Sequence, residues 1–266
     1  MIRDGALKLT HPPRLLHAKD DTPLRLGISY QEIVLTTRDG LKLAAWYTPP
    51  QNGVVVLVAH GYAGKRSAEM HALFARHGYG ALAWDMRAHG ESEGELCTVG
   101  YAEAGDVETA LDFALSQPDV KHVVAWGESM GGVATILAGA RRPEIEAVVA
   151  DSAFTSLEDE LTMRVPTPLL RALIRFFAEQ EVGGSIQAVR PVDQIGRLHP
   201  RAVFIIQGLA DQSIPSDSGR RLYAAAGEPR FLWEEDGVGH GGMYAAWPGE
   251  YEVRVIAFFE EALRRE

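Results

Sequence analysis

The strongest constraint on the fold of this chain is a series of apolar runs, each followed by a segment with helical spacing. The first run, VVVLVAHG at 54–61, is rich in β-branched residues and lacks polar alternation, which indicates a strand covered on both faces. Similar runs follow at 79–87, 120–127, 145–153, 201–208 and 229–235. Helical segments lie between or after them at 67–78, 102–117, 130–142, 218–227 and 250–265. This alternation predicts an α/β fold with a mostly parallel, doubly wound sheet.

Two segments precede the alternating region. QEIVLTT (31–37) and LKLAAWYTP (41–49) predict an antiparallel β-hairpin, because Asp39-Gly40 between them is a favoured turn pair. Residues 1–27 are rich in Pro, His, Arg and Lys. We expect this N-terminal stretch to form an arm that lies on the surface.

One segment, residues 154–200, interrupts the alternation of strands and helices. It contains VPTPLLRALIRFFAEQ, in which Leu169, Leu173 and Phe177 fall on one helical face. We interpret 154–200 as a small helical cap inserted into a single domain of residues 1–266. The three apolar residues are candidates for lining a substrate pocket. The alternative is that this helix simply packs on the sheet.

Composition limits the class of partner. The net charge is −10 and no basic stretch is present, which argues against nucleic acid or an anionic membrane as the partner. The single cysteine, Cys97, excludes an intrachain disulfide, and with scattered histidines it gives no metal-ligand spacing. No apolar run has the length of a signal peptide core or a membrane span. We therefore expect a soluble cytoplasmic protein; its oligomeric state is left open.

A short motif, GESMGG at 127–132, follows the buried strand predicted at 120–127. G-x-S-x-G occurs by chance, and a strand has to turn somewhere. Here, however, the motif lies between a buried strand and an Ala/Gly-rich helix. In that context Ser129 is predicted to be a nucleophile on a strained strand-to-helix turn.

Two further reactive groups follow strand ends in the order of an acyl-transfer triad. Asp211 comes after the strand at 201–208, and His240 comes after the strand at 229–235. Ligands collect beyond the carboxyl ends of strands in open parallel sheets. A serine hydroxyl needs a base to take its proton, and His240 can serve while Asp211 orients and stabilises the imidazolium.

The oxyanion formed during acyl transfer needs donors that are already in position, each worth about 3–4 kcal/mol. The backbone N–H of Met130 is one candidate, because it starts the helix after Ser129. The backbone N–H of Tyr62, after the first buried strand, is the second.

With these pieces together, the chain resembles the α/β-hydrolase superfamily over roughly residues 28–265. It is most similar to bacterial serine hydrolases with an HGY-type oxyanion loop, a group of esterases, thioesterases and serine aminopeptidase-like enzymes. The matching segments are VLVAHGYAG (56–64), DMRAHGES (85–92), GESMGG (127–132), GLADQSIP (208–215) and GHGGM (239–243). The resemblance implies ester hydrolysis without a cofactor or metal, with Ser129, Asp211 and His240 in the triad positions.

The chain departs from the family pattern at two points. Ala88 stands where relatives often carry Gly, and the oxyanion loop reads HGYAG rather than the HGGG of one lipase branch. Some relatives place the triad acid after the fourth buried strand, which makes Asp151 the main rival of Asp211. Asp236 is nearer to His240 in sequence but precedes it on the same loop.

Several other residues have structural interpretations. We expect His60 to hydrogen-bond backbone near the oxyanion loop, and Asp85 and Arg87 to form an ion pair that fixes their loop. Cys97 has no evident base partner and is expected to be inert.

The sequence thus predicts a carboxylesterase for short to medium acyl esters of small molecules, acting through an acyl-enzyme on Ser129. An acyl-CoA thioesterase and an aminopeptidase or amidase use the same triad and remain alternatives. For the last, Glu128, Glu158, Asp159 and Glu160 are candidate anchors for a substrate amine. A non-catalytic binding module on the same scaffold is the alternative from a different class, and the intact Ser/Asp/His set counts against it.

Overall fold

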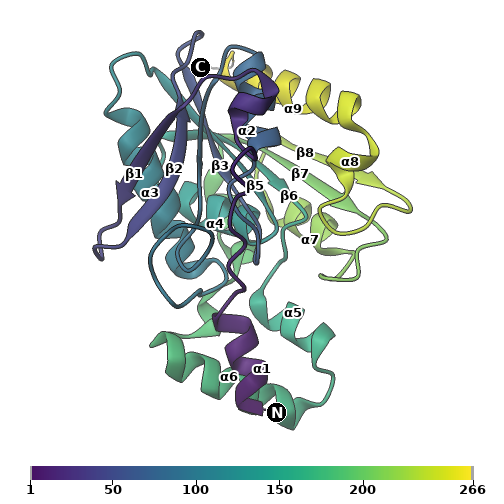
Figure 1. The fold of residues 1–266 in the computed structure, drawn as a ribbon. Coiled ribbons are helices and arrows are strands. Elements are labelled where there is room, and N and C mark those ends of the chain that lie inside the picture. The colour runs from purple at the N-terminus through teal and green to yellow at the C-terminus, as the bar shows by residue number, and fades with distance from the viewer. Residues whose placement is uncertain (1, 265–266) are drawn as a thin grey trace.

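The computed structural model describes residues 2–264, and an eight-stranded sheet forms its centre (Figure 1). The strand order is β1-β2-β4-β3-β5-β6-β7-β8. The pairs β1–β2 and β2–β4 are antiparallel and all later pairs are parallel. The strands are β1 (Gln31–Thr36), β2 (Lys42–Thr48), β3 (Val54–Ala59), β4 (Gly80–Trp84), β5 (His122–Glu128), β6 (Ile145–Asp151), β7 (Ala202–Gly208) and β8 (Arg230–Glu235). The predicted sheet and its leading hairpin are confirmed.

Helices connect the strands and cover the sheet. They are α1 (Ile2–Thr10), α2 (Ala68–Arg76), α3 (Tyr101–Leu115), α4 (Met130–Gly139), α5 (Leu157–Arg164), α6 (Pro168–Val182), α7 (Ser218–Ala225), α8 (Met243–Ala246) and α9 (Pro248–Leu263). Short 3₁₀ turns occupy Pro23–Leu26, Ile186–Ala188, Pro191–Asp193 and Ile195–Leu198. Ser67 caps α2, since its side chain accepts a hydrogen bond from the Met70 N–H. No helix within residues 2–264 is long and apolar enough to cross a membrane.

The core has two parts, one on each face of the sheet. Alternate residues of β3 belong to different parts: Val55 and Leu57 pack with α3 and α4, whereas Val56 and Val58 pack with α2 and α9. This division follows from the two-residue side-chain period of a strand. Because both faces are covered, every residue of β3 is buried. The continuous apolar runs of the sequence have this physical origin.

Between β6 and β7 the chain leaves the sheet and forms α5, α6 and three 3₁₀ turns. Helix α1 joins this group: Figure 1 shows α1, α5 and α6 together at one end of the molecule, away from α9. Ala6 of α1 is fully buried and belongs to the same apolar cluster as Ile174 and Ala178 of α6. Sequence analysis did not anticipate a helix in this part of the N-terminal arm, nor its packing on α6.

Candidate active site

The turn between β5 and α4 holds Ser129 in an unusual backbone conformation. Its φ is 52° and its ψ −117°, a region that costs energy for a residue with a side chain and is found mostly at functional sites. The turn is so tight that a Cβ on Gly127 would collide with the carbonyl of Gly131, and a Cβ on Gly131 would collide with that of Ala59. The glycines of G-x-S-x-G are therefore required by close packing.

Three side chains from three different loops form one chain of hydrogen bonds. The Oγ of Ser129 lies 2.9 Å from Nε2 of His240. Nδ1 of His240 lies 2.6 Å from Oδ2 of Asp211. An ionised carboxylate can only accept, so Nδ1 carries the proton and Nε2 is free to accept the proton of the Ser129 hydroxyl. The structure thus brings together the three residues that the sequence singled out.

The surroundings of Asp211 favour its ionised form. Burial alone would raise the pKa of Asp211, but the hydrogen bond and charge of His240 and the backbone N–H groups of Ile214 and Ser213 lower it. Oδ1 accepts from those two N–H groups at 3.1 and 2.7 Å. The carboxylate is therefore fixed on one side while its other oxygen faces His240.

The pKa of His240 is shifted in the opposite direction, above its ordinary value. Burial lowers its pKa, but the hydrogen bond and charge of Asp211, together with the charges of Glu128 and Asp151, outweigh burial and leave the pKa raised. A raised pKa means that the imidazolium is stabilised. This is the charge state that His240 would pass through after taking a proton from Ser129.

A cavity of about 200 Å³ lies in front of Ser129. Tyr62 and Met130 both line it, together with Ser129 and His240. Met130 is the first residue of α4, so its N–H has no partner within the helix. The two residues whose amides are predicted as an oxyanion hole therefore border the same cavity as Ser129.

Comparison with known proteins places this geometry in a family. Residues 50–194, more than half of the chain, match the family model described as "Serine aminopeptidase, S33". The chain belongs to this family. An uncharacterized protein of Mycobacterium tuberculosis, Rv2307c, is 32% identical over 218 residues, which cover 79% of this chain and 72% of that protein. The uncharacterized protein YfhR of Salmonella typhi is 28% identical over 258 residues, covering 88% of this chain and 82% of that protein.

Solved structures agree with this assignment. The Pyrococcus furiosus esterase Pf2001 superposes with a TM-score of 0.80 at 26% identity, covering 96% of this chain and 98% of that chain. Est1E of Butyrivibrio proteoclasticus, solved with ferulic acid bound, has a TM-score of 0.69 at 20% identity, over 87% of this chain and 99% of that chain, and shows the fold alone. This chain from the S33 family is thus an α/β hydrolase, and hydrolase is the enzyme class that its relatives support.

The rival acids lie elsewhere in the hydrolase scaffold. The carboxyl of Asp151 accepts hydrogen bonds from Ser152 and Tyr251, each at 2.8 Å. Its backbone oxygen accepts from the Ser129 N–H at 2.7 Å. Asp151 therefore supports the turn without a hydrogen bond to His240. Asp236 is exposed at the end of β8.

Two histidines hold the loop after β3, which the sequence predicts to be the oxyanion loop. His60 is buried, its Nδ1 hydrogen-bonds the carbonyl of Gly61, and its Nε2 accepts from the Met86 N–H. Burial lowers the pKa of His60 to about 4, with the nearby His89 adding to the shift, so His60 is neutral at pH 7. His89 accepts from the Ala63 N–H through Nε2 at 3.2 Å. The expected structural role of His60 is confirmed by these contacts.

The expected ion pair between Asp85 and Arg87 is wrong. Asp85 pairs with Arg66 at 2.6 Å. Arg87 pairs instead with Asp106 at 2.7 Å and with Asp39 at 2.9 Å. The partners of Asp85 and Arg87 come from other loops and from α3, because a buried ion pair is set by tertiary packing rather than by closeness in sequence.

The residues predicted to line a substrate pocket do not border the cavity at Ser129. Leu169 is 72% exposed and Phe177 is 37% exposed, while Leu173 is partly buried. Helix α6 carries apolar residues around most of its circumference, so periodicity alone did not identify the inner face. That face is formed by Ile174 and Ala178, which pack on α1.

Sequence reasoning missed other residues at the cavity. Lys8 and Leu9 of α1 line it, as do Val99, Glu160 and Arg164. The Glu160 and Arg164 side chains pair at 2.8 Å. The sequence indicates Glu160 only as a candidate anchor for a substrate amine. The other two candidate anchors from residues 154–200 contact arginines: Glu158 contacts Arg171 and Arg175, and Asp159 contacts Arg221.

Proposed function

We propose that this α/β hydrolase is a carboxylesterase that cleaves esters of small molecules through an acyl-enzyme on Ser129. The observation that carries the proposal is the unbroken hydrogen-bond chain from Asp211 through His240 to the hydroxyl of Ser129. The esterase Pf2001 as a structural neighbour supports the same reaction. Short to medium acyl chains are the expected substrates, and the group formed by α1, α5 and α6 is the proposed cap over the site.

The proposed reaction has two halves. In the first, Oγ of Ser129 attacks the ester carbonyl carbon while its proton passes to Nε2 of His240. The oxyanion is stabilised by the N–H groups of Tyr62 and Met130, and its collapse releases the alcohol, which takes the proton from His240. In the second half, water attacks the acyl-enzyme, its proton passes to His240 and then to Ser129, and the carboxylic acid leaves.

Replacing the nucleophile tests this function. Ser129→Ala should keep the fold but lower kcat for p-nitrophenyl butanoate by about four orders of magnitude or more. A fluorophosphonate probe should label the wild-type protein and not this variant. Ser116, an exposed residue whose hydroxyl donates to the Phe113 carbonyl and accepts from the Gln117 side chain, provides the control, since Ser116→Ala should react and label as the wild type does. Wild-type turnover or labelling in Ser129→Ala would refute the proposal.

An aminopeptidase-like activity is a second candidate, favoured by one observation. Glu160 lies in the cavity with Ser129, and burial raises its pKa although Arg164 opposes the shift. A substrate ammonium would have to displace Arg164 from this carboxylate, which is why we place the ester first. Parallel assays of p-nitrophenyl esters, acyl thioesters and aminoacyl-arylamides decide the order. If arylamides are turned over faster than esters and this activity is lost in Glu160→Gln, the aminopeptidase-like activity comes first.

A further inference from the structure

A second cavity lies next to the site and has about twice its volume. It measures about 430 Å³, within the range of small-molecule sites. Its walls come from segments far apart in sequence: Leu9 and Thr10 of α1, Cys97 and Val99 before α3, Leu157 of α5 and Ile186 after α6. These side chains are mostly apolar. The cavity therefore suits an apolar group better than a charged one.

The two cavities meet at two residues. Leu9 and Val99 line both the 200 Å³ cavity at Ser129 and the larger cavity. Cys97 lines the larger one and its Sγ lies 3.4 Å from Sδ of Met130, the residue after the nucleophile. The larger cavity thus shares part of its wall with the cavity at Ser129.

Val99 is held in a strained conformation at this junction. Its φ is +54° and its side chain is only 4% exposed. Positive φ is a genuine outlier for a β-branched residue and needs support from its surroundings. Support comes from the N–H of Cys97, which bonds the carbonyl of Thr10 at 2.8 Å, and from Glu103, which bonds the N–H groups of Thr98 and Gly100.

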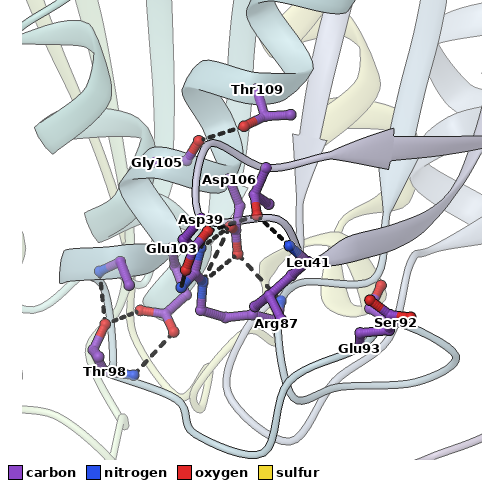
Figure 2. A network of polar contacts seen from close by, with 12 residues as sticks. Asp39, Leu41, Arg87, Ser92, Glu93, Thr98, Glu103, Gly105, Asp106 and Thr109 are labelled. Carbon is purple, nitrogen blue, oxygen red and sulfur yellow. Dashed lines mark hydrogen bonds and ion pairs between the residues drawn. The ribbon is translucent and has the colours of Figure 1, made fainter.

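Three polar residues of the larger cavity, Asp39, Arg87 and Thr98, already have partners. Figure 2 shows Arg87 bonded to Asp39 and Asp106, and Thr98 bonded to Glu103. Asp39, Arg87 and Thr98 line the cavity. Since the charge of Arg87 is matched by two carboxylates, it is not available to hold an anionic ligand. Most of the remaining wall of the cavity is apolar.

We infer that the larger cavity binds the acyl chain of the substrate, and that the enzyme prefers linear acyl groups of octanoyl to dodecanoyl length. This inference rests on the proposed function and extends its expected range of acyl length. Leu9 and Val99 form the passage through which the chain leaves the reaction centre. The cavity would then bury methylenes in the acylation and deacylation steps alike.

The acyl chain, rather than the alcohol, fits this position. The acyl group stays on Ser129 until water arrives, whereas the alcohol departs first. The cavity at Ser129 is bordered by Lys8, Arg164 and Ser213, of which Lys8 and Arg164 are exposed. This polar side suits the departing alcohol and the incoming water, which leaves the apolar side for the acyl chain.

Gly184 offers a way to fill the cavity. It lines the cavity, and a Cβ built on it meets no atom within 4 Å. Gly184→Leu should lower kcat/KM for p-nitrophenyl dodecanoate roughly tenfold or more, because several methylenes lose their apolar contact. The dodecanoate-to-butanoate ratio of kcat/KM should therefore fall. Gly105→Leu is the matched control, since Gly105 also has open space around its Cβ but does not line the cavity.

A second variant and a second substrate series complete the test. Leu9→Trp, at the junction, should reduce the dodecanoate-to-butanoate ratio as Gly184→Leu does. Ethyl and octyl acetate vary the alcohol instead, and their ratio should not change in either variant. A wild-type dodecanoate-to-butanoate ratio in both variants would overturn the inference. A loss of activity seen only with octyl acetate would overturn it as well.

A binding measurement separates this inference from the proposed function. Ser129→Ala cannot form an acyl-enzyme, but it should bind dodecanoate in titration calorimetry, and the added Gly184→Leu change should weaken that binding roughly tenfold or more. If no ester is hydrolysed but this binding is found, the esterase proposal fails and the cavity assignment stands. If esters are hydrolysed but this binding is not found, the esterase proposal stands and the cavity assignment fails.

Discussion

At the scale of single residues, Glu128 is the carboxyl that most affects the pKa of His240 after Asp211. Its carboxyl lies against Gly241, next to His240; a Cβ on Gly241 would be 3.0 Å from Cδ of Glu128. Burial raises the pKa of Glu128 to about 7, the charge of Asp151 adds to this, and His240 opposes it. In turn, ionised Glu128 contributes to the raised pKa of His240. The two groups therefore titrate as a coupled pair.

Removing the charge of Glu128 should shift the pH profile of the enzyme. In Glu128→Gln the pKa of His240 falls, because one negative charge that stabilises the imidazolium is gone. His240 must be neutral to accept the proton of Ser129, so the acid limb of kcat/KM should move to lower pH by about half a unit to one unit. Rates for p-nitrophenyl butanoate at constant ionic strength measure this limb. Glu144→Gln, at an exposed pair with Arg142, is the control; a limb that stays in place or moves upward in Glu128→Gln contradicts the prediction.

The positions of Ser129, Asp211 and His240 could be anticipated because each follows a strand end, where a parallel sheet gathers its loops. Their hydrogen bonds are seen in the structure, while their chemical roles stay a prediction. The partners of Asp85 could not be anticipated, because Arg66 lies on a different loop and nothing in the local pattern links the two. Buried ion pairs depend on tertiary packing, which sequence spacing does not encode.

At the scale of elements, the loop after β4 is tied to α3 by Arg87. Its guanidinium bonds Asp106, whose side chain is fully buried, and Asp39 on the β1–β2 turn (Figure 2). Burial raises the pKa of Asp106 to about 6, although Arg87 opposes the shift. The network also borders the inferred acyl cavity, so it fixes one wall of that space.

Arg87→Met should destabilise the protein strongly, because it leaves the Asp106 carboxylate buried without its cation. We expect a loss of about 3–5 kcal/mol at pH 7 in urea unfolding. The pKa of Asp106 would rise further, so the loss should be smaller at pH 5, where the folded state can keep the carboxyl protonated. Arg38→Met removes a cation that is 71% exposed and pairs with Glu108, and it should cost at most about 1 kcal/mol. Equal losses in the two variants would contradict this assignment.

At the scale of the whole molecule, the sheet could be predicted from the sequence, whereas helix α1 and its packing on α6 could not. Buried strands are continuous apolar runs and are recognised locally. Helix α1 has nine residues, too few to be stable alone, so its formation depends on packing against α6. That partner lies more than 150 residues later in the chain. For the same reason the inner face of α6 became evident only with α1 in place.

The packing of α1 on α6 can be broken at one residue to test whether these helices act as a unit over the site. Ala6 is fully buried in the cluster with Ile174, so Ala6→Glu would bury an unpaired carboxylate and should detach α1. Limited trypsin digestion should then cleave after Lys8 faster than in the wild type, and the dodecanoate-to-butanoate ratio should fall because Leu9 leaves the cavity wall. The circular dichroism melt of the sheet and its covering helices should move little, since α1 contributes no strand. Ala172→Glu, at an exposed position of α6, is the control and should change none of these measurements. If Ala6→Glu also changed none of them, α1 would not be part of the site.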